Sequence, residues 1–236
     1  CEILLLNEHS FQDFQQNLLV TLQQVSYLRD SNTASHQDRV SIYTQILATI
    51  LLDKKENHTL DELIQKNDLP AASDYFLISK EYIRDLLYSA SLHDLGKIRI
   101  PDQILCKPSG FTQDEYEIMK THSYEGYKLI EENLSEVESE EFLEVAKIMS
   151  LYHHEKWDGT GYPNKVKGND IPLCARIMAA ADVLDALLSK RQYKAAMSLE
   201  QALDIFEKSR GSHFEPCIVD AVLACQDKIR KIAFPD

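Results

Sequence analysis

Hydrophobic residues recur at three- and four-residue steps along most of the chain, which is the spacing of one face of an α-helix. The first such stripe fits a heptad pattern and contains Phe11, Phe14, Leu18, Val25 and Leu28. A short heptad helix is typical of a connector or a dimer stalk, and the alternative is that the stripe packs on the rest of the chain. No alternating run is long enough to predict a strand. The pattern therefore predicts an all-α fold.

The helix that follows the stripe carries His36 on its hydrophobic face and ends in a polar stretch. Thr59 followed by Glu62 has the spacing of a capping box, which predicts the start of a short helix. We expect two parts: a connector helix over residues 1–28, and a helical domain over residues 29–236 with an insertion at about residues 53–80.

Two of the later predicted helices bring histidine and aspartate to a helix end or close to a hydrophobic face. The first delivers His93 and Asp94 near its end. Thr112 and Glu115 form a capping box for the next helix, which we expect to continue past His122. These residues are therefore expected to point into the domain rather than into solvent.

The same arrangement is expected further along the chain. A helix that starts near residue 140 ends at His153 and His154, and a loop with Gly and Pro follows. The helix after Pro172 carries Asp182 in a run of alanines, where an unpaired carboxylate would be costly to bury.

Composition and charge narrow the class of protein. A hydrophobic content of 44% supports a sizeable core, and seven Gly and seven Pro argue against a β-rich fold with many turns. The net charge of −13 argues against binding long nucleic acid or inserting at an anionic membrane, and no apolar run approaches the roughly 20 residues that span a bilayer.

Five cysteines without a Cys-x-x-Cys pair argue against a disulfide framework. We expect a cytoplasmic protein, and the start at Cys1 without Met suggests a fragment or a processed product.

The histidines and aspartates on the successive helices indicate a metal centre. Burying several imidazoles and carboxylates together is costly unless divalent metals compensate them. The residues expected to act as metal ligands are His93, Asp94, His122, His153, His154 and Asp182, with His36 as a further candidate. Asp94 can offer each carboxylate oxygen to a different metal. His9 in the stalk and His213 in a turn are interpreted as ordinary polar residues. This constellation predicts a metal-dependent hydrolase.

Several motifs in this order and spacing resemble the HD-GYP family of bacterial cyclic di-GMP phosphodiesterases. They are His93-Asp94-Leu95-Gly96-Lys97, Ile100-Pro101-Asp102, His122, His153-His154-Glu155-Lys156-Trp157-Asp158-Gly159, Gly161-Tyr162-Pro163, Ala181-Asp182-Val183-Leu184-Asp185-Ala186 and Arg191-Gln192-Tyr193-Lys194. The resemblance covers residues 29–225 without the insertion. It implies an HD-domain helical bundle that hydrolyses cyclic di-GMP to linear pGpG, and in some members to GMP, with a hydroxide that bridges the metals.

The resemblance also implies roles for individual residues. Lys97 and Asp94 are the expected catalytic residues. The residues expected to bind the substrate are Gly161, Tyr162, Pro163, Asp185, Arg191 and Lys194. Tyr162 would offer a ring and a hydroxyl to a guanine or a phosphate, and Arg191 with Lys194 would bind the second phosphate. Asp185 would either contact a guanine edge or orient a metal ligand.

Two divalent metal ions are expected, usually iron or manganese in the family, with nickel or zinc as further possibilities. Members with a trinuclear centre carry a glutamate four residues before the early histidine. Asn32 stands at that position, four residues before His36. A neutral amide is a poorer ligand than a carboxylate, which argues against a third metal here and weakens His36 as a ligand.

The expected partners are cyclic di-GMP, an upstream sensory or receiver module, and a second copy of the chain bound through the N-terminal helix. Two alternatives remain open. One is a module that senses a cyclic dinucleotide with little turnover. The other is a phosphohydrolase for another nucleotide, such as cyclic GMP-AMP.

Overall fold

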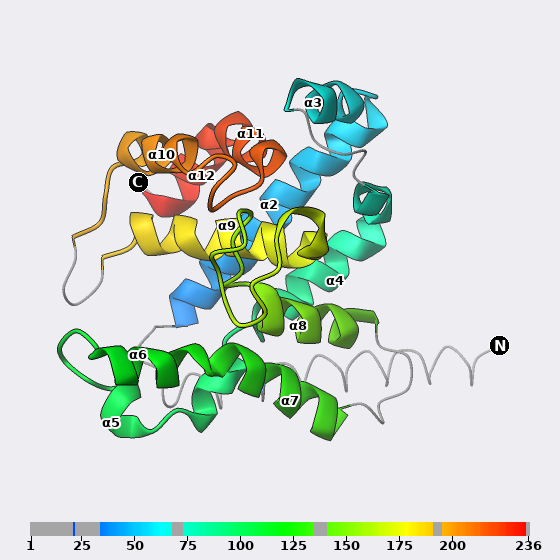
Figure 1. The fold of residues 1–236 in the computed structure, drawn as a ribbon. Coiled ribbons are helices and arrows are strands. Elements are labelled where there is room, and N and C mark those ends of the chain that lie inside the picture. Colours follow the sequence, from blue (N-terminus) through cyan, green and yellow to red (C-terminus); the bar gives the residue numbers. More distant parts are fainter. Residues whose placement is uncertain (1–20, 22–33, 68–72, 135–140, 191–194, 235–236) are drawn as a thin grey trace.

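The computed structural model describes residues 21, 34–67, 73–134, 141–190 and 195–234. Helices are the named elements in this part of the chain (Figure 1): α2 Ala34–Glu56, α3 Leu60–Lys66, η1 Ser73–Leu77, α4 Lys80–Ala90, η2 Leu95–Arg99, α5 Asp102–Leu105, α6 Gln113–Lys120, α7 His122–Leu134, α8 Glu141–Tyr152, η3 Gly168–Asp170, α9 Leu173–Leu188, α10 Leu199–Lys208, α11 Pro216–Ala224 and α12 Gln226–Ala233. The predicted all-α fold is confirmed. Across these residues, no helix combines the length and apolar character needed to cross a bilayer.

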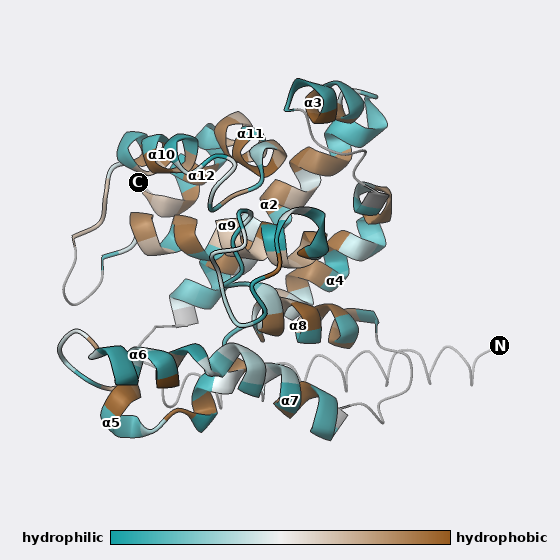
Figure 2. Ribbon diagram, viewed as in Figure 1, coloured by the Kyte–Doolittle hydropathy of each residue, from teal (hydrophilic) through white to brown (hydrophobic). Residues whose placement is uncertain are grey.

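Helices α2 and α9 cross at the centre of the domain, with α10, α11 and α12 on one side and α4, α8 and α7 on the other (Figure 1). Helix α9 is buried around most of its circumference, as expected of a helix that is hydrophobic on more than one face. Figure 2 shows more hydrophobic residues along α9 and α11 than along the outer helices α6 and α7. The central helix thus carries Asp182 from the main core toward the site.

A smaller core joins η2, α7 and α8, and it brings the His93-Asp94 turn against the start of α7. Two glycines allow this approach. A Cβ atom on Gly96 would lie 1.9 Å from the carbonyl oxygen of His122 and 2.3 Å from the backbone nitrogen of Gly126. The two backbones therefore touch, which fixes Asp94 next to His122.

The prediction of one helix from Thr112 past His122 is wrong in one respect, because the helix is broken at Thr121. Helix α6 ends at Lys120 and α7 begins at His122. The Thr121 hydroxyl donates to the carbonyl of Ile118 at 2.7 Å, and such a bond competes with the helical ladder. The predicted cap is present, with Thr112 and Glu115 bonded reciprocally. The break places His122 at a helix start.

The capping box predicted at Thr59 and Glu62 is also wrong. Thr59 has helical dihedral angles and makes no side-chain cap bond, and its hydroxyl instead donates to the carbonyl of Lys54 at 3.3 Å. The residues interpreted as an insertion contribute Leu60 and Tyr75 to the main core. The connector expected at residues 1–28 lies outside the described residues, apart from Thr21.

Candidate metal centre

The residues predicted as metal ligands come together, and all of them except the fully buried His93 line one pocket of about 500 Å³. They arrive from five segments: His36 from α2, His93 and Asp94 from the turn after α4, His122 from the start of α7, His153 and His154 from the turn after α8, and Asp182 from α9. Two groups have ligand atoms within 4.8 Å of one another, namely His36 with His93 and Asp182, and His122 with His153 and His154.

Asp94 lies between these two groups. Its Oδ1 atom is 3.2 Å from His122 Nε2, and its Oδ2 atom is 3.3 Å from His93 Nε2. The Nζ atom of Lys97 is 2.7 Å from the same Oδ2 atom. Each carboxylate oxygen thus faces a different group of histidines, which is the arrangement of a bridging ligand.

The backbone fixes the tautomers of three histidines. The Nδ1 atoms of His93, His122 and His153 lie 2.7, 2.7 and 2.9 Å from the carbonyl oxygen three residues earlier in each case. A carbonyl oxygen can only accept, so each Nδ1 carries the proton and donates it. In a neutral ring the lone pair is then on Nε2, the atom that faces the centre of the cluster.

These Nε2 atoms fit a cation. His93 Nε2 is buried and has no hydrogen-bond partner among the residues that the structure describes. His122 Nε2 lies 3.3 Å from His153 Nε2 and 3.2 Å from His154 Nε2. Burial, followed by the nearby His93 and His122 rings, lowers the pKa of His153 to about 3. His153 is therefore unprotonated on Nε2 at neutral pH, and no proton there relieves the repulsion between the lone pairs. The donor set of imidazoles and carboxylates fits divalent metal ions.

The environment of Asp94 keeps its carboxyl ionised. Burial alone would raise its pKa, but the Lys97 ammonium and the nearby His93 and His122 rings outweigh burial and hold the pKa well below its ordinary value. A carboxylate that is 7% exposed is therefore available as a ligand at neutral pH.

Asp185 orients His36. Its Oδ2 atom lies 2.6 Å from His36 Nδ1, and its Oδ1 atom accepts from Arg39 Nε at 2.5 Å. The side chain is 1% exposed and does not line the pocket. Of the two roles expected for Asp185, this geometry favours positioning a ligand, since His36 Nε2 then faces Asp182 Oδ1 at 3.7 Å.

The Gly161-Tyr162-Pro163 loop lies against the histidine cluster. The Tyr162 ring stacks on His154 with centroids 4.7 Å apart, and its backbone N–H donates to the His154 carbonyl at 3.2 Å. A Cβ atom on Gly161 would lie 2.4 Å from the backbone nitrogen of Lys156, so only glycine permits this close fold. The Tyr162–Pro163 peptide bond is cis.

Two residues of the site were not predicted. Glu155 is 2% exposed, and its Oε1 atom accepts from the backbone N–H groups of Asn164 at 2.6 Å and Lys165 at 3.0 Å. Its place directly after the paired histidines was the available signal. The ring of His213, which was interpreted as an ordinary turn residue, lines the pocket. The aromatic neighbour Phe214, on which that ring stacks, was the signal there.

Two residues expected to bind the substrate, Arg191 and Lys194, lie outside the described part of the chain. Asn32, the position where a ligand for a third metal is missing, also lies outside it.

Comparisons with known proteins agree with this site. Residues 74–218 match the family model described as HD domain. A protein named cyclic di-GMP phosphodiesterase from Vibrio cholerae is 39% identical over 215 residues, covering 91% of this chain and 40% of that protein. A protein named 3′3′-cGAMP-specific phosphodiesterase 2 from the same organism is 34% identical over 224 residues, covering 94% of this chain and 37% of that protein.

A solved structure supports the fold. It is the crystal structure of a cyclic GMP-AMP specific phosphodiesterase from Vibrio cholerae, which matches with a TM-score of 0.57 at 17% identity over 91% of this chain and 49% of that chain. The chain thus spans about half the length of the solved structure and less than half that of the two relatives. HD-domain phosphohydrolases use divalent metals, and the two groups of histidine and aspartate residues described here can hold such ions. The chain belongs to the HD domain family, and its motifs are those of the HD-GYP branch.

Proposed function

We propose that this chain is a phosphodiesterase domain that hydrolyses cyclic di-GMP to linear pGpG, with GMP as the alternative end product. The observation that carries the proposal is the position of Asp94, with one oxygen toward each group of histidines and with Lys97 beside it. The relative with 39% identity is named for this reaction. Such a site suits attack on a phosphodiester, in which negative charge develops on the phosphoryl oxygens.

The cofactor in this proposal is a pair of divalent metal ions, with iron or manganese first and nickel or zinc as alternatives. His36, His93 and Asp182 would hold one ion, while His122, His153 and His154 would hold the other, with Asp94 shared. When bound, such ions polarise the phosphate and activate water near neutral pH. Asn32 in place of a glutamate argues against a third ion.

The chain supplies charge and orientation of its own. Lys97 lines the pocket and pairs with Asp94, so its ammonium can stabilise the charge that develops on the leaving oxygen. Tyr162, together with Gly161 and Pro163, would contact a guanine or a phosphate of the substrate. Arg191 and Lys194 would bind the second phosphate, and Asp185 would act through His36 rather than by touching the substrate.

A second candidate is a phosphodiesterase for 3′,3′-cyclic GMP-AMP. The relative with 34% identity is named for that specificity, and the metal-binding residues serve either phosphodiester equally well. A sensing module with little turnover is less favoured, because Asp94, Lys97 and both histidine groups are all in place.

The test is anaerobic purification followed by metal analysis and a product assay. Cyclic di-GMP and 3′,3′-cyclic GMP-AMP are supplied separately, and products are separated by chromatography. We expect about two metals per chain and linear pGpG from cyclic di-GMP. Tight binding of a cyclic dinucleotide without turnover by the metal-loaded protein would favour the sensing module, and faster turnover of cyclic GMP-AMP would favour the second candidate.

The cellular context belongs to the same proposal. The named relatives are more than twice as long as the matched region, which supports an upstream sensory or receiver module. Cys174, Cys217 and Cys225 are buried free thiols, which supports a cytoplasmic location. A homodimer through the N-terminal helix stays a prediction.

A further inference from the structure

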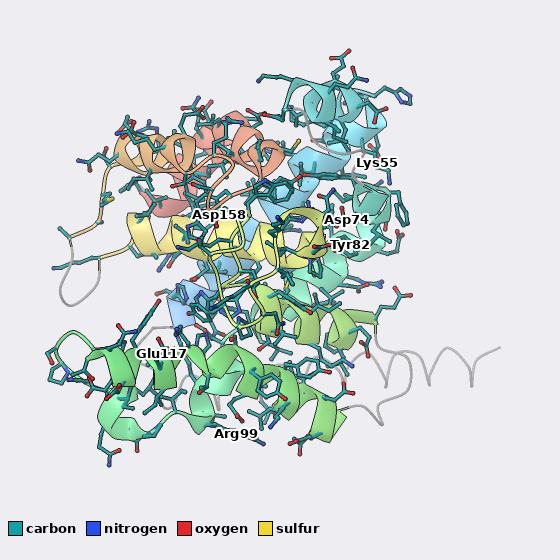
Figure 3. The ribbon with its side chains drawn as sticks, viewed as in Figure 1. Lys55, Asp74, Tyr82, Arg99, Glu117 and Asp158 are labelled. Carbon is teal, nitrogen blue, oxygen red and sulfur yellow. The ribbon has the colours of Figure 1, made fainter. Side chains whose placement is uncertain are left out.

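The pocket extends beyond the metal ligands to a wall formed by Lys156 and His213. Lys156 lies in the loop after α8, and His213 lies in the connection between α10 and α11. Two backbone hydrogen bonds tie these segments together, from Trp157 N to the His213 carbonyl at 3.0 Å and from Asp158 N to the Ser212 carbonyl at 2.9 Å. In Figure 3, Asp158 of the loop after α8 is seen in front of α9, and Glu117 lies below it on α6.

The His213 ring is held rigidly. It stacks on Phe214 with centroids 4.2 Å apart and an interplanar angle of 9°. Phe214 in turn stacks on Phe206 at 4.4 Å, and these two rings are 2% and 0% exposed. A side chain fixed by a stack that is rooted in the core loses little entropy when it binds a ligand.

The polar atoms of this wall are available to a ligand. The side chain of Lys156 makes no ion pair with any residue that the structure describes, and its ammonium carries three N–H donors. His213 belongs to neither group of metal-binding residues. Burial, followed by the charge of Lys156, lowers the pKa of His213 to about 4, so the ring is a neutral donor and acceptor at physiological pH.

Aromatic side chains line the same pocket from the α6 side. Phe111 and Tyr116 are 41% and 44% exposed, which leaves their faces open. The Lys120 ammonium lies 5.3 Å from the centre of the Tyr116 ring and 5.7 Å from that of Tyr162. Aromatic and cationic groups of this kind stack on flat nucleobases. The pocket therefore offers faces for a base on one side and hydrogen-bond donors on another.

We propose that Lys156 and His213 bind the O6 and N7 edge of one guanine of the cyclic dinucleotide and so select guanine over adenine at that position. The proposal rests on the proposed function and adds the two residues that recognise the base. Guanine presents two adjacent acceptors on this edge, which match two donors. Adenine presents an amino group in place of O6, and that donor would face the ammonium.

A base edge suits this pair better than a phosphate does. A phosphate is bound most strongly by charged donors such as an arginine fork or an imidazolium. A neutral imidazole is better suited to the uncharged acceptor atoms of a base edge. In the proposed function, the scissile phosphate is bound at the histidine clusters and Lys97, which line another part of the pocket. The exposed rings of Phe111 and Tyr116 serve a flat group and not a tetrahedral one.

The experiment compares His213→Phe and Lys156→Met with the wild-type protein. Phenylalanine keeps the stack on Phe214 but removes the ring nitrogens, and methionine keeps an aliphatic chain without the charge. Lys208→Met on the outer face of α10 is the matched control, since Lys208 is 74% exposed and pairs only with the helix neighbour Asp204 among the described residues. Equilibrium binding and kcat/KM are measured with cyclic di-GMP and cyclic di-AMP. Cyclic di-AMP is the informative probe because 3′,3′-cyclic GMP-AMP can still place its one guanine in the site.

We expect each pocket variant to bind cyclic di-GMP about tenfold more weakly, the size of one lost base contact. KM should rise more than kcat falls, metal content should be unchanged, and the affinity for cyclic di-AMP should stay nearly constant. Equal losses for the two dinucleotides would show a phosphate or ribose contact and would overturn the proposal, as would unchanged binding of cyclic di-GMP. If His213→Phe misfolds, His213→Ala and Lys156→Met provide the same comparison. Failure of the proposed function would differ, since the metal-loaded wild-type protein would then hydrolyse no cyclic dinucleotide.

Discussion

The Nε2 atoms of His122 and His153 face each other at 3.3 Å while both rings donate their Nδ1 protons to backbone carbonyls. Two lone pairs held this close repel unless a cation lies within reach of both. Helix α7 and the first half of α8 are packed on each other through the smaller core, which restrains the two helices that carry these rings. The fold itself thus prepares the site for a metal.

Removing the metals should therefore destabilise the protein. An ion present at 100 to 1,000 times its dissociation constant adds about 3 to 4 kcal/mol to the free energy of unfolding. We expect a chelator to lower the melting temperature, as measured by calorimetry with and without added manganese. The double variant His122→Ala, His153→Ala should lose most of this response. A melting temperature that is the same with and without chelator would contradict the assignment.

The bridging position of Asp94 gives the second prediction. Asp94→Asn keeps the shape of the side chain but removes the negative charge that faces both histidine groups. We expect turnover of cyclic di-GMP to fall at least about a hundredfold and bound metal to decrease, because an amide is a weak bridge between two cations. Asp204→Asn on the exposed face of α10 is the control and should keep full activity. Wild-type hydrolysis by Asp94→Asn would refute the metal mechanism.

The third prediction concerns Asp185, which is buried with His36 and Arg39. Burial alone would raise its pKa, but the hydrogen bonds from His36 and Arg39 outweigh it and lower the pKa below the ordinary value. A depressed folded pKa adds stability that is present above the unfolded pKa of about 4 and is lost as pH falls through the folded pKa. Asp185→Asn should therefore be less stable than wild type at pH 7, with the gap closing below about pH 4.

Denaturant unfolding of the metal-free proteins at several pH values measures this gap. Glu207→Gln is the control, because Glu207 pairs with Arg210 at the surface and is 53% exposed. A gap between wild type and Asp185→Asn that does not change with pH would argue against an ionised Asp185. At neutral pH, metal content should also fall in Asp185→Asn, since His36 loses the group that orients it.

Most of the helices and the ligand cluster were predictable from the sequence, because both leave local signals. The three- and four-residue spacing identifies buried faces, and His93, Asp94, His122 and Asp182 stand out as polar groups on or beside those faces. Their convergence is confirmed as geometry, although their role as ligands stays a proposal.

Tertiary contacts determined what the sequence did not reveal. His213 looks like a turn residue until its stack on Phe214 and the backbone bonds to the loop after α8 bring it to the pocket. The break at Thr121 depends on side-chain bonds to the backbone that compete with a helical pattern. Arg176 lies in an otherwise apolar stretch of α9, and the acidic residues that compensate it are distant in the sequence.

That buried arginine gives the fourth prediction. The guanidinium of Arg176 bonds to Asp74 and Glu215, and its side chain is 3% exposed. Arg176→Met would leave Glu215 buried without its counter-charge, which costs about 3 to 5 kcal/mol and about 10 °C in melting temperature. Arg230→Met removes an exposed ion pair with Glu200 and should leave the melting temperature nearly unchanged. Equal decreases in melting temperature for the two substitutions would show that the buried ion pair contributes no more to stability than the exposed one.

The last prediction concerns Glu155, which connects the loop to the cluster. It follows His154 directly, and its carboxylate accepts the backbone N–H groups just beyond Pro163. Glu155→Ala should release this loop and the Tyr162 ring that stacks on His154. We expect KM for cyclic di-GMP to rise about tenfold with a smaller change in kcat, and metal content to stay constant.

Glu155→Gln retains an acceptor oxygen for the loop and should recover most of the wild-type KM. Trp157, the single tryptophan, lies in the same loop, so its fluorescence reports the loop independently of activity. Asp170→Ala, an exposed change at the end of η3, is the matched control and should alter neither KM nor the spectrum. If Glu155→Ala lost metal in proportion to activity and left the Trp157 emission unchanged, the carboxylate would support the histidine cluster rather than the loop.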